Sequence, residues 1–125
     1  MIRHHSFPYL LSLLLLCLLS GLSGCNRSML NSLTTIAAGK QFELGGNQHG
    51  AFTVRFRNVG SVPVTLRERR PDGTTDSLAT FRPGQGNTLW FSPNAGVLIA
   101  NASTQPAQVS LTVTGDKNLS MRNLD

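Results

Sequence analysis

Apolar and polar residues alternate along much of the chain after residue 40, and this period of two restricts the fold more than any other feature. Such alternation is typical of strands that bury one face and expose the other. The alternating segments are 42–44, 52–57, 62–67, 109–114 and 119–122. Two more continuously apolar runs, 87–91 and 97–100, are predicted to be central strands, and residues 78–81 a further short strand.

Turn-forming residues separate these segments, and each turn holds a proline or a residue that tolerates positive φ. They are Gly45-Gly46-Asn47, Asn58-Val59-Gly60, Pro71-Asp72-Gly73, Arg82-Pro83-Gly84 and Pro93-Asn94-Ala95-Gly96. A content of 12 glycines, 6 prolines and only 14% charged residues suits a β-rich domain with many turns. About seven or eight short strands in this arrangement predict an all-β fold, an antiparallel sandwich or barrel.

Residues 52–66 (FTVRFRNVGSVPVTL) resemble the early hairpin of bacterial immunoglobulin-like modules. In those modules an apolar strand ends at Asn-x-Gly, and the next strand opens with Pro-Val. The resemblance implies a small immunoglobulin-like β-sandwich, although the Cys-Trp-Cys pattern of antibody domains is absent. A sandwich supports many functions, so the fold class alone assigns none.

The first 24 residues have the three parts of a secretory signal. A short positive head contains Arg3, an almost pure leucine run covers residues 10–19, and small residues precede Cys25. The alternatives are a plain secretory signal without a lipid and a single transmembrane helix. The apolar run has roughly 10–13 residues and is shorter than the ~20 that a spanning helix needs.

The segment Leu22-Ser23-Gly24-Cys25 resembles the lipobox of bacterial lipoproteins. This resemblance covers the first 26 residues. It implies that the sulfur of Cys25 takes a diacylglycerol, that cleavage follows residue 24, and that the new amine is acylated. Asn26 stands where enterobacterial lipoproteins of the inner membrane carry Asp, which implies an outer-membrane protein facing the periplasm. The inner membrane stays open as an alternative.

The expected organisation is therefore a signal peptide (1–24), a lipid-anchored tether (25–40) and a β-sandwich domain (41–125). Cys17 leaves with the signal, so the mature chain has one cysteine and no internal disulfide. Lipidation of Cys25 explains an odd cysteine in an exported protein.

The mature sequence offers no set of residues that suggests catalysis. His49 is its only histidine, and no other ligand types cluster nearby, so no metal or other cofactor is predicted. No Gly-x-Ser-x-Gly motif is present to hold a nucleophile. Asp72 and Asp76 flank a turn, where carboxylates usually support the turn rather than glycoside hydrolysis. The chain is expected not to be an enzyme, and a hydrolase is the least favoured alternative.

Two groups of side chains are candidates for binding. Trp90, with Phe81 and Phe91, is interpreted mainly as part of the core, with sugar stacking on Trp90 as the alternative. Arg55, Arg57, Arg67 and Arg69 are all expected to face outward. The short 58–60 link favours a hairpin, which would gather these four arginines into one positive patch. A solvated face partly neutralised by nearby carboxylates is the plainer interpretation.

A lipid-anchored, non-enzymatic cell-envelope lipoprotein that acts as a binding or structural module is the expected function. Its expected partners are the membrane, through the lipid on Cys25, and an envelope protein or an anionic envelope polymer. The net charge of +5 is too small and diffuse to indicate nucleic acid. The alternative is a carbohydrate- or peptidoglycan-binding module that uses Trp90. A binding module would have an exposed Trp90 or a grooved arginine face, and a purely structural protein would have neither.

Overall fold

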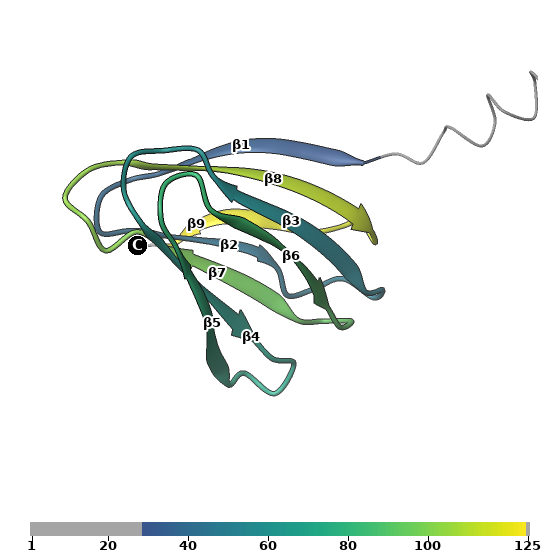
Figure 1. Cartoon of the computed structure of the whole chain (residues 1–125). Helices are drawn as coiled ribbons and strands as arrows, with labels where there is room; N and C mark the ends of the chain where they lie inside the picture. The colour runs from purple at the N-terminus through teal and green to yellow at the C-terminus, as the bar shows by residue number, and fades with distance from the viewer. Residues whose placement is uncertain (1–28, 125) are drawn as a thin grey trace, which may run out of the picture.

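The computed structural model describes residues 29–124, which form nine strands and no helix (Figure 1). In chain order the strands are β1 (Leu30–Ile36), β2 (Gln41–Gly45), β3 (Phe52–Asn58), β4 (Val64–Arg69), β5 (Thr75–Phe81), β6 (Gly86–Phe91), β7 (Gly96–Ala100), β8 (Ala107–Gly115) and β9 (Met121–Leu124). The all-β prediction is confirmed. No helix in this part of the chain is long and apolar enough to cross a membrane. The predicted signal peptide and Cys25 lie outside the described residues.

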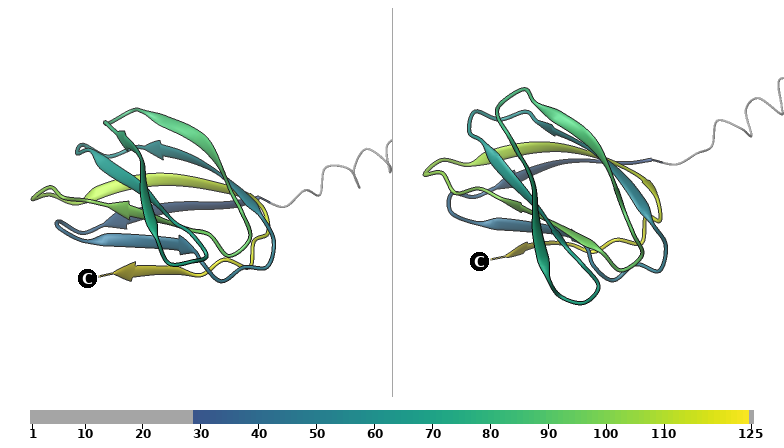
Figure 2. Two further views of the ribbon diagram at one scale, coloured as in Figure 1. Left: turned by 90° about the horizontal axis from the view of Figure 1, so that it is seen from below. Right: turned by 60° about the horizontal axis from the view of Figure 1, so that its bottom comes forward.

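The strands form two antiparallel sheets, which pack against each other as two layers (Figures 1 and 2). The four-stranded sheet has the order β1-β8-β3-β6, and the five-stranded sheet has the order β5-β4-β7-β2-β9. Four pairs nest along the chain: β1 with β8, β2 with β7, β3 with β6, and β4 with β5. This is the pattern of one long hairpin folded over into two sheets, an eight-stranded jelly roll to which β9 adds a strand.

The finer prediction of an immunoglobulin-like sandwich is not confirmed, because its hairpin between the third and fourth strands does not form. β3 pairs with β6 and β8, whereas β4 pairs with β5 and β7 in the other sheet. Asn58 holds the link between them in a crossover. Its Nδ2 donates to the carbonyls of Val62 (2.8 Å) and Phe81 (3.0 Å), and its Oδ1 accepts from the backbone N–H of Gly60 (3.0 Å).

Apolar side chains fill the space between the two sheets, as the alternation predicts. Phe91 stacks on Phe52, with ring centroids 5.1 Å apart, and meets Phe56 edge-on at 6.4 Å. The buried apolar residues span Ile36 to Val113, so a chain that begins after residue 25 keeps the whole core. The described residues therefore contain the whole of this core and can fold as one unit.

The sandwich begins at Leu30, so the predicted tether over residues 25–40 is wrong in its length. All seven residues of β1 pair with β8, and Ile36 is fully buried. The period-two pattern does not reveal β1, because an apolar residue of this strand faces solvent and a polar one faces the core. Leu33 points outward and is 68% exposed, whereas Thr34 is buried.

The two apolar runs have different places in the sheets. β7 is central, between β4 and β2, as predicted, and even its outward-facing Leu98 is only 3% exposed. β6 was expected to be central but forms an edge of the four-stranded sheet. One face of its Leu89-Trp90-Phe91 run is therefore open to solvent.

Candidate functional site

The structure separates the four arginines that were expected to form one patch. Arg55 and Arg57 lie on β3 in the four-stranded sheet, and Arg67 and Arg69 lie on β4 in the five-stranded sheet. All four face outward, so the two pairs lie on opposite faces of the sandwich. The prediction of a single four-arginine surface is wrong, because it depended on the β3–β4 hairpin. Arg55 and Arg57 belong to one candidate site and Arg69 to another, whereas Arg67 lies outside both and donates from Nη2 to Thr75 Oγ1 (2.8 Å).

We call the outer side of the four-stranded sheet the β3 face. Its side chains form three cross-strand rows, and successive rows are about 6.6–6.8 Å apart because side chains on one face of a strand recur every second residue. The rows are Trp90–Thr53–Thr114, Thr88–Arg55–Thr112–Asn31 and Gly86–Arg57–Ser110–Leu33. No carboxylate lies on these strands, since the five acidic residues of the described segment are in β2, β4, β5 and two loops.

Arg55 and Arg57 are the charged groups of this face. Neither side chain forms an ion pair or a hydrogen bond with any residue of the described segment. Both line a groove of about 390 Å³ that also includes Gly84, Gly86 and Asn87. Gly86 is required there, because a Cβ would come within 2.1 Å of the carbonyl oxygen of Phe56. The close approach of β6 to β3 therefore leaves Arg57 with no side chain opposite it on that strand.

A second groove, of about 330 Å³, continues from Arg55 toward the start of β1. Its lining comprises Met29, Asn31, Thr53, Arg55, Thr88, Thr112 and Thr114. Trp90 lies beside it, directly across from Thr53, and is 65% exposed. Its neighbour Phe91 is buried, and so is Phe81. The core interpretation thus holds for the two phenylalanines and is wrong for Trp90.

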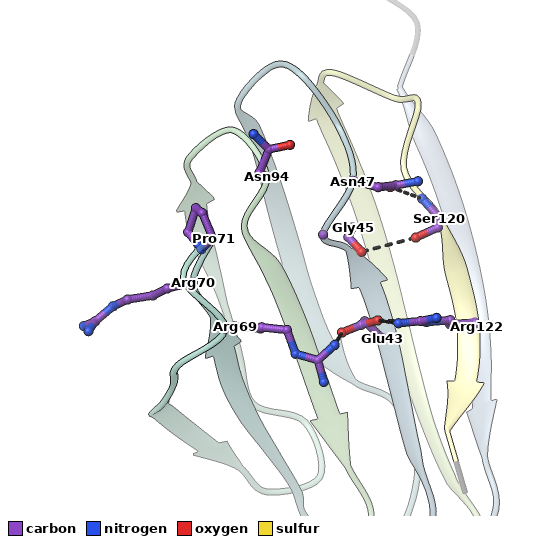
Figure 3. Close-up of a pocket in the computed structure, with 11 residues that line it drawn as sticks. Glu43, Gly45, Asn47, Arg69, Arg70, Pro71, Asn94, Ser120 and Arg122 are labelled. Carbon is purple, nitrogen blue, oxygen red and sulfur yellow. Dashed lines mark hydrogen bonds and ion pairs between the residues drawn. The ribbon is translucent and has the colours of Figure 1, made fainter.

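The second candidate site lies on the opposite face, around Glu43 (Figure 3). Glu43 points outward from β2 but is only 2% exposed. Arg122 of β9 donates Nε–H to Glu43 Oε1 over 2.8 Å and also pairs with it through Nη2. Arg69 of β4 forms an ion pair with Glu43 Oε2. Arg69 stands opposite Gly96 of the intervening β7, and this glycine leaves the space across which the arginine reaches Glu43.

A hollow of about 360 Å³ lies next to this Arg69–Glu43–Arg122 triad. Gly45 and Gly46 belong to its lining and add no side chains, so the hollow stays open between the loops. Asn47, Asn94 and Ser120 supply neutral polar groups around it. The remaining lining residues are Arg70, Pro71 and Gly73 of the β4–β5 turn. Figure 3 shows that the Arg70 side chain points away from Glu43, and this arginine pairs with Asp76.

Hydrogen bonds fix the loops around the hollow. The buried Gln48 side chain donates from Nε2 to the carbonyl of Ala95 (2.9 Å) and accepts from the backbone N–H of Gly46 (2.8 Å). Asp116 accepts backbone hydrogen bonds from Asn118 (3.0 Å) and Gly50 (2.8 Å), and these hold the pKa of its carboxyl below the usual value. The β2–β3 loop is thereby joined to the β6–β7 and β8–β9 loops.

His49 lies exposed in the β2–β3 loop, as expected for a polar loop residue. Residues 29–124 contain no group of three His, Cys, Asp or Glu side chains that could hold a metal ion. The hydrogen bonds of the Asp72 carboxylate to Thr74, from its hydroxyl (2.6 Å) and its backbone N–H (2.9 Å), lower the pKa of Asp72 and mark it as a turn-forming residue.

Comparisons with known proteins give a fold and no family. No protein-family model and no curated protein sequence matches the chain. Among solved structures, the Cupin_2 domain of an XRE family transcriptional regulator from Enterobacter cloacae is similar, with a TM-score of 0.50 and 16% identity over 73% of this chain and 85% of that one. A cupin protein from Bacteroides fragilis has a TM-score of 0.46 and 18% identity, with 74% and 70% of the two chains covered. The first of these likenesses agrees with the jelly-roll topology and extends to the fold alone.

Proposed function

We propose that this chain is a lipid-anchored lipoprotein of the cell envelope whose jelly-roll domain is a non-enzymatic binding module for an anionic glycan. The leader and the lipobox-like segment before Cys25 support the anchor, and Asn26 supports an outer-membrane location facing the periplasm. The lipid on Cys25 holds the domain on the membrane. Because β1 begins at Leu30, only residues 26–29 separate the anchor from the sandwich, and the domain sits close to the bilayer.

One observation carries the choice of ligand. The side chains of Arg55 and Arg57 lack partners in the described segment, line a groove on a face without carboxylates, and lie on the same face as the exposed Trp90. Guanidinium groups bind carboxylates and phosphates with two parallel hydrogen bonds. An exposed indole ring offers an apolar face and one N–H donor, which suits the mixed surface of a sugar ring. The sequence hypothesis asked a binding module for an exposed Trp90 or a grooved arginine face, and the β3 face has the exposed Trp90 together with a groove lined by two of the four arginines.

The spacing of these groups favours a polymer over a single sugar. Thr53, which pairs with Trp90, lies four residues from Arg57 along β3, and that separation corresponds to about 13 Å. Arg55 lies between them. A chain of several sugar units that carries carboxylates can place one ring on Trp90 and its acidic groups on the arginines. Peptidoglycan is an envelope polymer of this kind.

A binding titration of the Cys25→Ser mature protein tests the proposal. Its ligands are soluble peptidoglycan fragments and oligogalacturonate, with dextran as the uncharged control. Wild type should bind the acidic glycans in a salt-sensitive manner and leave dextran unbound. Replacing Arg55 and Arg57 together by Gln should weaken binding at least tenfold, because each charged hydrogen bond is worth about 1.5–3 kcal/mol.

Two further variants complete the test. Trp90→Ala should weaken binding to the same ligands, whereas Arg67→Gln, an outward arginine on the opposite sheet, should bind as wild type does. Absence of binding to either acidic glycan would reject the proposed ligand class. Equal losses in the β3-face variants and in Arg67→Gln would reject the site and indicate diffuse charge attraction instead.

A further inference from the structure

We propose that the hollow beside the Arg69–Glu43–Arg122 triad is a second, independent binding site, and that it takes a phosphate group. The two arginines come from β4 and β9, and Glu43 on β2 stands between them (Figure 3). The inference does not rest on glycan binding, because this site lies on the opposite sheet from Arg55, Arg57 and Trp90.

Glu43 acts here as a positioning residue. Its carboxylate is almost fully buried, and it holds Arg122 through Nε and Nη2 and pairs with Arg69 through Nη1. A guanidinium has five N–H donors, so most of the donors of Arg69 and Arg122 remain available to a ligand. The side chains of these arginines are 36% and 59% exposed. Donors held in place before binding lose less freedom when the ligand arrives, and this favours affinity.

The charge around the hollow favours an anion. Two arginines against one carboxylate leave a net charge of +1 in the triad. Arg70 also lines the hollow, and its charge is balanced by the ion pair with Asp76. The glycines of the lining add no side chains that would fill the hollow, and Asn47, Asn94 and Ser120 supply neutral polar groups. A purely structural triad would need no such open, polar hollow beside it.

The position of the hollow suggests two sources for the phosphate. Loops β2–β3, β4–β5, β6–β7 and β8–β9, which surround it, lie at the end of the sandwich where β1 begins. Residues 26–29 can span at most about 14 Å when extended. A lipid on Cys25 would therefore hold this end next to phospholipid headgroups. A soluble phosphate compound is the other source, and the chemistry at the arginines is the same for both.

The test uses the Cys25→Ser mature protein and follows backbone amide shifts by NMR during titration with inorganic phosphate. The amides of Gly46, Asn47 and Ser120 should shift, which separates this site from phosphate bound to Arg55 and Arg57. Arg69→Gln and Arg122→Gln should each weaken the affinity reported by these amides about tenfold or more. Arg67→Gln is the matched control, since it lies on β4 outside the hollow and should leave the affinity unchanged.

Vesicles of phosphatidylcholine with and without phosphatidylglycerol identify the source. Sedimentation only with phosphatidylglycerol, lost in Arg122→Gln, assigns the site to a lipid headgroup, whereas phosphate binding without vesicle binding assigns it to a soluble compound. Arg122→Lys keeps the charge and loses the fork, so it should retain the fold and bind phosphate more weakly. The proposal is overturned if phosphate leaves the amides of Gly46, Asn47 and Ser120 unmoved, or if folded Arg122→Gln binds phosphate as wild type does. Either result leaves glycan binding on the β3 face untouched.

Discussion

Replacing both arginines of the triad should destabilise the domain far more than replacing either one. Glu43 is 2% exposed, whereas Arg69 and Arg122 are partly exposed. With both arginines changed to Met, a buried carboxylate loses its ion pairs, and this costs about 3–5 kcal/mol. A single change leaves one arginine in place, and its partial exposure limits the loss to about 1 kcal/mol. The effects should therefore be strongly non-additive.

Adding Glu43→Gln to the double variant should restore part of the stability, because it removes the buried charge that the arginines neutralise. Urea unfolding and thermal unfolding, both followed by far-ultraviolet circular dichroism of the Cys25→Ser protein, measure the stability of each variant. In a domain of this size, 1 kcal/mol shifts the melting temperature by about 4–8 °C, so the double variant should melt at least about 12 °C lower. A loss below about 1 kcal/mol in the double variant, with no recovery in the triple variant, would refute this account of Glu43.

Three further predictions concern the core, a loop and the anchor. Phe91→Ala should cost about 3–5 kcal/mol in the same urea experiment, because this buried ring contacts two other phenylalanines, and a loss under 1 kcal/mol would contradict the packing. The folded pKa of Asp116 is lowered, so its stabilisation is complete above the unfolded value of about 3.9 and disappears as pH falls through the folded pKa. Asp116→Asn should accordingly make the urea midpoint fall less steeply with acid, and an unchanged slope would argue against these hydrogen bonds. Cys25→Ser should abolish incorporation of a clickable fatty acid in cells, and continued labelling of the variant would exclude lipidation at Cys25.

The sequence predicted the strands that have a clear period of two. It failed for strands in which the polarity of a side chain does not match its burial, or in which an apolar run lies at the edge of a sheet. β3 and β8 alternate cleanly because each buries one face in the core, so their segments are recognisable from the order of apolar and polar residues alone. β1 was missed because Leu33 faces solvent while Thr34 is buried. β6 was misplaced because its apolar run is typical of a central strand, although Trp90 faces outward from an edge.

Strand pairing was harder to predict than strand position. Asn58-Val59-Gly60 is compatible with a tight hairpin, but the Asn58 side chain bonds to Val62 and Phe81 and directs the chain into the other sheet. This long-range contact decided where the four arginines lie, and no local pattern reveals it. The triad was missed for the same reason. Glu43 and Arg122 are separated by 79 positions and meet only because β9 pairs with β2.

The most direct test of the β3 face as the ligand surface is an amide shift map of the Cys25→Ser protein titrated with oligogalacturonate. Binding along the grooves should shift the amides of Thr53, Arg55 and Arg57 on β3 and those of Thr88 and Trp90 on β6. These shifts should saturate together and weaken as salt is raised. Shifts confined to the five-stranded sheet, or none at ligand concentrations that saturate binding, would contradict the proposed site.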